Sequence, residues 1–227
     1  MIGVKQPRVL LLASLCAGLG SPRAALAQPA PRIEIGIGVQ WIGQQTLGTR
    51  AATETTGAGS TLTLFSTTSE LAGAGGVDGR VGVRLTSSLV AEAEASYLKP
   101  SLRIAVSGDT EGGAATTAAE TIEQFTIGGG VRWLLPGGRR SPRFSPFLAG
   151  SVGYLRQLHE GGTFVETGQY YSLGGGVSSV LWRGGRLHTK GVGIRGDVRA
   201  VIRSKGVAFD GGSKTSPAAG VSAFVRF

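Results

Sequence analysis

The chain has 227 residues, enough for one domain or two small ones. Glycine accounts for 39 of them, well above the usual share of about 7 %, yet the three-residue period of collagen is missing. A hydrophobic fraction of 41 % argues against a disordered chain. The net charge of +9 is not gathered into Lys/Arg runs or basic–aromatic motifs, so no nucleic-acid partner is expected.

The first 27 residues are organised like a Sec signal peptide. Cations precede an apolar stretch at 9–19, and an A-x-A site ends at Ala27. The apolar stretch is too short to cross a bilayer as a helix, and the large residue before Cys16 disfavours a lipoprotein. We therefore expect cleavage of residues 1–27 and a mature domain of residues 28–227. Cleavage removes three cations, which leaves a charge of 20 − 14 = +6, and it also removes the single cysteine.

Beyond residue 28 the apolar residues recur with a period of two, which is typical of β-strands. In the first such segment Ile35 and Ile37 share one face, and Glu34 lies on the other. Segment 191–203 has the clearest pattern, because all four of its charged residues fall on one face. Segment 146–155 is apolar on both faces, so its phase stays open. Eight segments qualify as strands: 32–43, 77–85, 89–97, 125–135, 146–155, 170–182, 191–203 and 217–227.

Short and long connections alternate between these segments. The short ones are 86–88, 136–142 and 183–190, and the others are long and polar. Within the first long connection, residues 61–67 could form a hairpin that extends the sheet. Short turns on one side and long loops on the other are the layout of an outer-membrane barrel, with the turns in the periplasm and the loops outside.

The period alone does not say which face meets water. A soluble barrel of the lipocalin kind hides its apolar face inside, whereas a membrane barrel presents it to lipid. Strands of about ten residues and aromatic residues near the strand ends favour lipid. These aromatic residues are Trp41, Tyr97, Trp133, Tyr154, Tyr171, Trp182 and Phe227. The expected fold is all-β, an eight-stranded antiparallel up-and-down transmembrane β-barrel.

The polar faces of the strands would then line the barrel interior. Eight strands leave an interior just wide enough for side chains, and an isolated charge there is costly. We therefore expect the six arginines and five acids of this face to pair into a salt-bridged plug. The expected network comprises Glu34, Asp78, Arg80, Arg84, Glu92, Glu94, Arg132, Arg195, Asp197, Arg199 and Arg203.

Three segments, PFLAGSVGY, GIRGDVRAVI and the terminal SAFVRF, resemble the small outer-membrane β-barrels of the OmpA-transmembrane-domain, OmpX and OmpW kind. In that family the last strand ends on an aromatic residue with apolar residues at alternate positions before it. Val221, Ala223, Val225 and Phe227 match this pattern. The resemblance covers nearly all of residues 28–227 and implies residence in the bacterial outer membrane, contact with its lipids and recognition by the barrel-assembly machinery.

The sequence gives little indication of catalysis. His159 and His188 are the only histidines, and neither stands in the His-x-Ser pattern of the lipid A deacylase barrels. His159 with Glu160 is the remaining acid–base candidate. Two separated histidines and a mature chain without cysteine make a metal site improbable. We expect no enzyme activity, no cofactor and no metal.

The expected function is therefore an integral outer-membrane protein with a structural or surface-interaction role and an extracellular ligand that the sequence does not identify. A narrow channel for small or hydrophobic solutes is the alternative, as OmpW-like proteins suggest. A lipid A-modifying enzyme and a soluble periplasmic lipid-binding barrel are the remaining hypotheses.

Overall fold

The computed structural model describes residues 33–108, 114–135, 144–160, 162, 164–182, 191–206 and 212–227. The expected signal peptide lies outside these residues, as do the expected turns at 136–142 and 183–190. The described residues contain no helix that is long and apolar enough to span a membrane.

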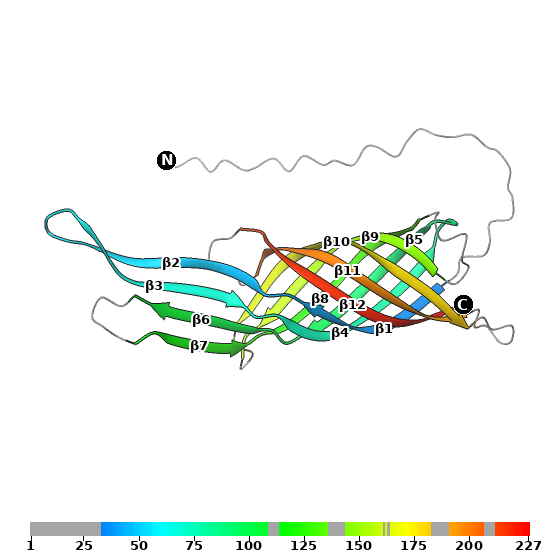
Figure 1. Cartoon of the computed structure of the whole chain (residues 1–227), viewed down its shortest axis with the longest axis horizontal. Coiled ribbons are helices and arrows are strands. Elements are labelled where there is room, and N and C mark those ends of the chain that lie inside the picture. The colour runs from blue at the N-terminus through cyan, green and yellow to red at the C-terminus, as the bar shows by residue number, and fades with distance from the viewer. Residues whose placement is uncertain are drawn as a thin grey trace, which may run out of the picture. The chain divides into compact units, whose positions relative to one another are not determined.

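Eight antiparallel strands of the described chain close into a barrel, each paired with its neighbour (Figure 1). The barrel closes where the first strand pairs with the last, in a register that places Ile37 opposite Ala223. The predicted eight-stranded up-and-down barrel is thereby confirmed. The strands are β1 (Ile33–Ile42), β4 (Ala74–Arg84), β5 (Leu89–Leu98), β8 (Glu123–Leu134), β9 (Phe144–Leu158), β10 (Val165–Trp182), β11 (Gly191–Lys205) and β12 (Lys214–Arg226).

A second sheet continues one part of the barrel wall beyond the barrel (Figure 1). Its strands are β2 (Gln45–Thr55), β3 (Thr61–Leu71), β6 (Ser101–Ser107) and β7 (Thr116–Thr121), in the order β2-β3-β6-β7. The barrel strands β1, β4, β5 and β8 are neighbours in the same order. Each strand of the second sheet directly follows or precedes one of them in the sequence, so the two sheets have matching strand orders. Buried Leu47, Leu71, Leu102 and Ile122 pack together at its base.

The second sheet is larger than the sequence indicated. The possible hairpin at 61–67 is the longer hairpin β2–β3, in which Thr55 pairs with Thr61. Strands β6 and β7 were expected to be part of polar connections. Their residues alternate weakly, and β7 is exposed along most of its length, so the period-two signal of a half-buried strand is missing there.

The apolar face of the barrel points outward. Ile37 is 72 % exposed and Leu173 is 71 % exposed, while their strand neighbours face the interior. The seven strands whose phase the sequence indicated all have that phase. In β9, whose phase was open, Leu148 and Val152 face outward, and Phe147 lies inside at 2 % exposure.

Two rows of outward-facing aromatic residues border the apolar band. One row lies at the end with the short turns and contains Trp133, Phe144, Trp182 and Phe227; the other contains Trp41, Tyr97, Phe125, Tyr154 and Tyr171. Phe144 and Tyr154 are ten residues apart on β9, which is about 33 Å of strand at about 3.3 Å per residue. A tilt of about 40° reduces this to roughly 25 Å along the barrel axis, the height of the apolar band of membrane barrels.

Candidate functional site: the charged barrel interior

A cluster of ion pairs fills the interior near the turn end. Arg132 is fully buried, and its guanidinium lies 2.7 Å from Glu34 Oε1 and 3.0 Å from Glu92 Oε1. Each carboxylate has a second arginine, because Arg226 Nε lies 2.8 Å from Glu34 Oε2 and Arg195 Nη1 lies 2.8 Å from Glu92 Oε1. The five side chains come from β1, β5, β8, β11 and β12, so the cluster ties together strands from all around the barrel.

A second cluster lies next to it, toward the middle of the barrel. Arg80 Nε lies 2.9 Å from Asp78 Oδ2, and Arg80 Nη1 donates to Asp197 Oδ1 at 3.0 Å. Arg199 joins Asp197 and Glu94 with distances of 2.7 Å and 3.2 Å. Arg195 Nε, 3.4 Å from Asp197 Oδ1, connects the two clusters. Five arginines therefore face five carboxylates in one continuous network.

Uncharged side chains complete the network. Ser151 Oγ and Tyr170 Oη both donate to Glu94 Oε1, at 2.6 Å and 2.9 Å. Room for Tyr170 comes from Gly128, because a Cβ at that position would collide with the tyrosine hydroxyl and with the carbonyl oxygen of Val152. The ring of Phe147 lies beneath two guanidinium groups, those of Arg132 and Arg195, at 5.5 Å and 4.4 Å.

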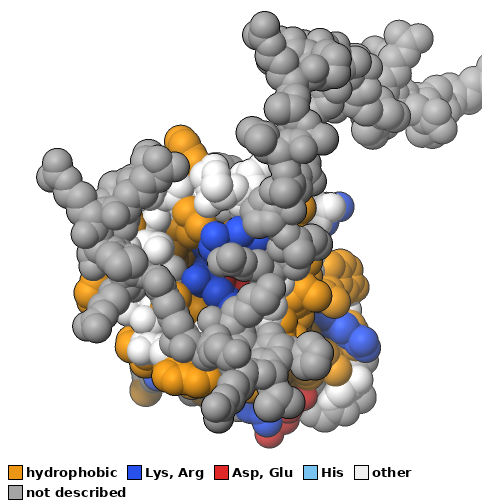
Figure 2. All heavy atoms as spheres, turned by 90° about the vertical axis from the view of Figure 1, so that its right-hand side faces the viewer, with side chains coloured by type: hydrophobic (Ala, Val, Ile, Leu, Met, Phe, Trp, Pro, Cys, Tyr) orange, Lys and Arg blue, Asp and Glu red, His pale blue; other side chains and the backbone are white. Residues whose placement is uncertain are grey.

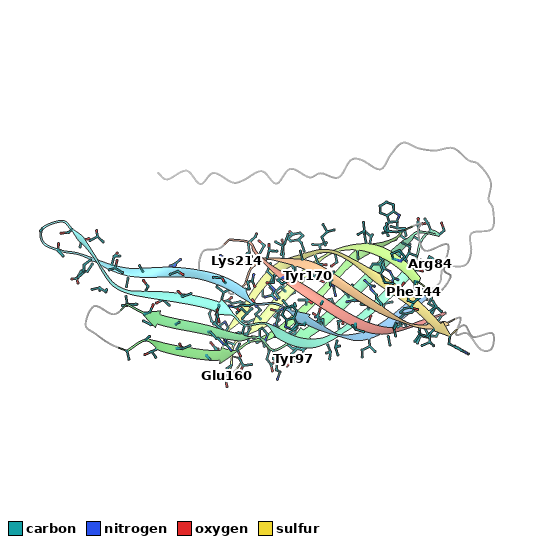
Figure 3. All side chains as sticks on the ribbon, in the orientation of Figure 1. Arg84, Tyr97, Phe144, Glu160, Tyr170 and Lys214 are labelled. Atoms are coloured by element: carbon teal, nitrogen blue, oxygen red, sulfur yellow. The ribbon has the colours of Figure 1, made fainter. Side chains whose placement is uncertain are left out.

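The expected and observed interiors differ in membership. Arg226 joins the network, although it was not among the residues expected there. Arg84, expected in the network, is half-buried at the turn end of the barrel (Figure 3). Arg203, also expected there, is 6 % exposed and donates to the amide oxygen of Gln45 instead of a carboxylate.

Buried side chains fill the interior between the strands that the structure describes. Next to the second cluster is a cavity of about 30 Å³, and beyond it Ile42, Leu98, Val201 and Ala218 form a buried apolar layer. Figure 2 views the barrel from the turn end and shows Lys and Arg side chains in the middle with hydrophobic side chains around them. The charged side chains are thus inside and the apolar ones outside, the reverse of a soluble barrel.

The expected His159–Glu160 pair does not form. Instead His159 Nδ1 lies 3.0 Å from Glu120 Oε1, and its Nε2 lies 3.8 Å from Glu166 Oε1. Burial raises the pKa of Glu166, an effect that the charge of His159 partly offsets. His188 lies outside the described residues. In the described ranges, no three His, Cys, Asp or Glu side chains are grouped so that they could hold a metal ion.

An apolar groove lies on the outer surface of the barrel. It measures about 730 Å³ and lies across β1, β4, β5, β8 and β9, where the small residues Gly79 and Ala95 are flanked by Tyr97, Phe125 and Tyr154. The groove overlaps the row of aromatic residues farther from the turns. Arg156 lines it on the side beyond Tyr154.

The four residues expected to form the C-terminal assembly signal lie on the lipid-facing surface. Val221, Ala223 and Val225 point outward from β12, and Val221 is 60 % exposed. Phe227 follows the strand, and its N–H donates to the carbonyl oxygen of Ile33 at 2.9 Å. The motif therefore stands at the seam where the first and last strands close the barrel.

No known family model and no curated protein matches the sequence. Among solved structures, the outer membrane protein OprG from Pseudomonas aeruginosa matches with a TM-score of 0.50 and 12 % identity, over 88 % of this chain and 97 % of that one. The chain has the fold of the small outer-membrane β-barrels. This fold and the outward apolar band are those of a protein of the bacterial outer membrane.

Two further outer-membrane β-barrels are similar at lower scores. Neisserial surface protein A has a TM-score of 0.47 and 14 % identity, over 85 % of this chain and 95 % of that one. Ail of Yersinia pestis, solved with the heparin analogue sucrose octasulfate, has a TM-score of 0.39 and 9 % identity, over 87 % and 99 %.

Proposed function

We propose that this outer-membrane β-barrel is a non-conducting, non-enzymatic protein that presents its second sheet as an interaction surface outside the cell. The observation that carries the proposal is the filled interior. Ten paired charges, Phe147 and Phe224 occupy the half of the barrel near the turns, and the cavity next to them has room for about one water molecule.

Conduction would require this network to open. Separating Arg132 from Glu34 and Glu92 would leave buried charges without partners, which costs about 3–5 kcal/mol for a single broken pair. Several such pairs lie in sequence along the barrel axis. The alternative, a narrow channel, therefore needs a rearrangement of many side chains at once, whereas a permanently closed barrel needs none.

The second sheet, rather than the barrel interior, offers a surface for binding. It stands beyond the aromatic row, and the outer halves of β2 and β3 are exposed on both faces, with Thr-rich sequences. Its edge strands β2 and β7 have backbone groups that no neighbouring strand in the described chain pairs. Long polar segments carried on a rigid barrel are a common arrangement for binding.

The lipid and assembly partners belong to the same proposal. The apolar groove beside Tyr97 and Tyr154 suits acyl chains of the outer leaflet, and the exposed motif ending in Phe227 suits recognition by the barrel-assembly machinery before the strand inserts. Cleavage of residues 1–27 stays a prediction. An intact mass beginning at Gln28 for the outer-membrane species would check it.

Planar-bilayer recording tests the closed interior. The folded protein, identified by an electrophoretic shift between cold and boiled samples, is added to both chambers at molar salt. Co-flotation with vesicles shows that the protein inserts into membranes. We expect membranes that contain the inserted protein to carry no steady single-channel current. Regular current steps from the heat-shifted species would overturn the closed-barrel proposal in favour of the channel.

Shortening the β2–β3 hairpin tests the role of the second sheet. Thr49 and Thr68 are paired in the ladder, so the residues between them can be replaced by an Asn-Gly turn without disturbing the buried base. The variant should keep its heat-dependent shift. We expect cells that express the full-length protein to sediment faster than cells without it, and cells that express the variant to lose this difference. Equal sedimentation of both would contradict an interaction role for this hairpin.

A further inference from the structure

The apolar groove on the barrel surface has a floor of small residues. Gly79 of β4 and Ala95 of β5 are paired in the ladder, and both face outward. Ile37 of β1 and Ile127 of β8 are their neighbours in the same row and form the sides of the groove. With about 730 Å³, the groove is within the range of about 300–1,000 Å³ that is typical of ligand sites. The barrel wall is therefore hollowed where large side chains are missing.

The groove leads from the outer aromatic row into the apolar band. Tyr97 and Phe125 border it at the end farther from the turns, and their ring centroids are 4.7 Å apart. Toward the turns, the next outward pair of β5 and β8 is Ala93 and Gly129, which are also small. An acyl chain that begins at the aromatic row can therefore lie along a line of small residues toward the middle of the membrane.

Arg156 places a positive charge at the same end of the groove. It lines the groove, is exposed, and is paired with Phe125 in the ladder between β8 and β9. A neighbouring cation, Lys99, has its ammonium 3.0 Å from Glu123 Oε1, so its charge is compensated. Arg156 makes no ion pair with a carboxylate of the described chain. The groove thus combines an apolar floor with an uncompensated cation just beyond the aromatic row.

We propose that this groove binds one acyl chain of a phosphate-bearing lipid of the outer leaflet, and that the lipid phosphate binds the Arg156 guanidinium. The proposal rests on the proposed function, which places this end of the barrel in the outer leaflet. Apolar surface alone gives no preference for the groove, because lipid tails surround the whole barrel with the same apolar medium. Shape and charge give the preference, since the small residues admit a chain and a guanidinium forms charge-assisted hydrogen bonds with phosphate.

Native mass spectrometry of the folded, detergent-solubilised protein tests the phosphate contact. The probes are lipid A with two phosphates and the same lipid A after dephosphorylation. We expect wild type to retain one lipid A molecule and to bind the dephosphorylated form roughly fivefold more weakly, the factor typical of one cation near anionic lipid. Arg156→Gln should bind both forms at the weaker level. Vesicles of phosphatidylcholine contain no lipid with a net charge, so there Arg156 behaves as an ordinary exposed arginine.

Filling the groove tests the acyl-chain contact. A Cβ at Gly79 meets no atom within 4 Å, so the side chain of Gly79→Leu occupies the groove without a clash. Gly196→Leu is the matched control, because Gly196 faces outward from β11 on the other side of the barrel, and the nearest atom to a Cβ there is 4.0 Å away. Gly79→Leu should lose the bound lipid A, and Gly196→Leu should retain it.

Three outcomes would overturn the proposal. Equal binding of the two lipid forms by wild type would exclude the phosphate contact, and equal lipid A binding by wild type and Gly79→Leu would exclude the groove. A lipid-free dimer that Gly79→Leu disrupts would assign the groove to a second copy of the chain. Each variant is first shown to fold by its heat-dependent shift, so a loss of lipid binding leaves the closed barrel intact, whereas current steps in planar bilayers would contradict the closed barrel without affecting the lipid site.

Discussion

Replacing Arg132 by methionine probes the interior network at its most buried member. The guanidinium loses its ion pairs with Glu34 and Glu92, while the methionine keeps an apolar stem against Phe147. Removing one partner of a buried ion pair costs about 3–5 kcal/mol. We expect the lower end, about 3 kcal/mol, because each carboxylate retains a second arginine at 2.8 Å.

The assay is urea unfolding of the protein from lipid vesicles, followed by tryptophan fluorescence and by the heat-dependent gel shift. With a slope of about 2–3 kcal/mol per molar urea, a loss of about 3 kcal/mol lowers the midpoint by roughly 1–1.5 M. Arg156→Met is the matched control, because that arginine is exposed on the outer face, and its midpoint should change by less than about 0.2 M, equivalent to about 0.5 kcal/mol.

A double-mutant cycle separates the ion pair from the loss of packing. Combining Arg132→Met with Glu34→Gln should reveal a coupling free energy of about 2 kcal/mol, within the range for residues in one buried network. A cost below about 1 kcal/mol for Arg132→Met together with no coupling would refute the reasoning. It would mean that water screens these pairs as it does at a surface, which is the behaviour of an open lumen.

Three further predictions address the membrane face, assembly and pH. Leu173→Arg, in the middle of the lipid-facing band, should destabilise the barrel by about 2–4 kcal/mol, whereas Thr63→Arg on the exposed β3 should change the urea midpoint little. Phe227→Ala should lower the fraction of protein that reaches the heat-shifted form in vivo, while refolding into detergent in vitro stays normal. Equal in vivo yields of the variant and the wild type would contradict a role of the C-terminal motif in assembly. Burial raises the pKa of Glu166, so the folded state holds this proton more tightly than the unfolded chain, and the associated stability is present at low pH and is lost as pH rises through the raised pKa. Glu166→Gln should abolish that part of the pH dependence in urea titrations, and an unchanged profile would contradict the assignment.

The barrel was predictable from the sequence because membrane strands must separate apolar from polar residues at every second position. In β11, Arg195, Asp197 and Arg199 alternate with Ile194 and Val198, and no other phase hides the charges from lipid. The phase of β9 was not predictable. Its inward residues include Phe147 and Leu155, which pack within the interior and are as apolar as its outward residues.

Most members of the interior network were predictable, but their pairing was not. Counting arginines and acids on the polar faces suggested near-balance, yet the partner of each depends on the register between strands far apart in the sequence. Arg226 meets Glu34 because the two positions are paired across the β1–β12 seam. Arg203 lies past the apolar layer that begins at Val201, beyond the reach of the carboxylates, and sequence alternation cannot show that separation.

Tryptophan quenching by brominated lipids tests the central claim most directly, because all three tryptophans of the chain face outward. Trp41, Trp133 and Trp182 are each about half exposed at the borders of the apolar band. For protein refolded into vesicles, the account predicts strong quenching, greater for bromines near the headgroups than for bromines at the chain ends. Fluorescence that brominated lipids leave unchanged would place the apolar face inside the barrel and contradict an outer-membrane protein with a charged interior.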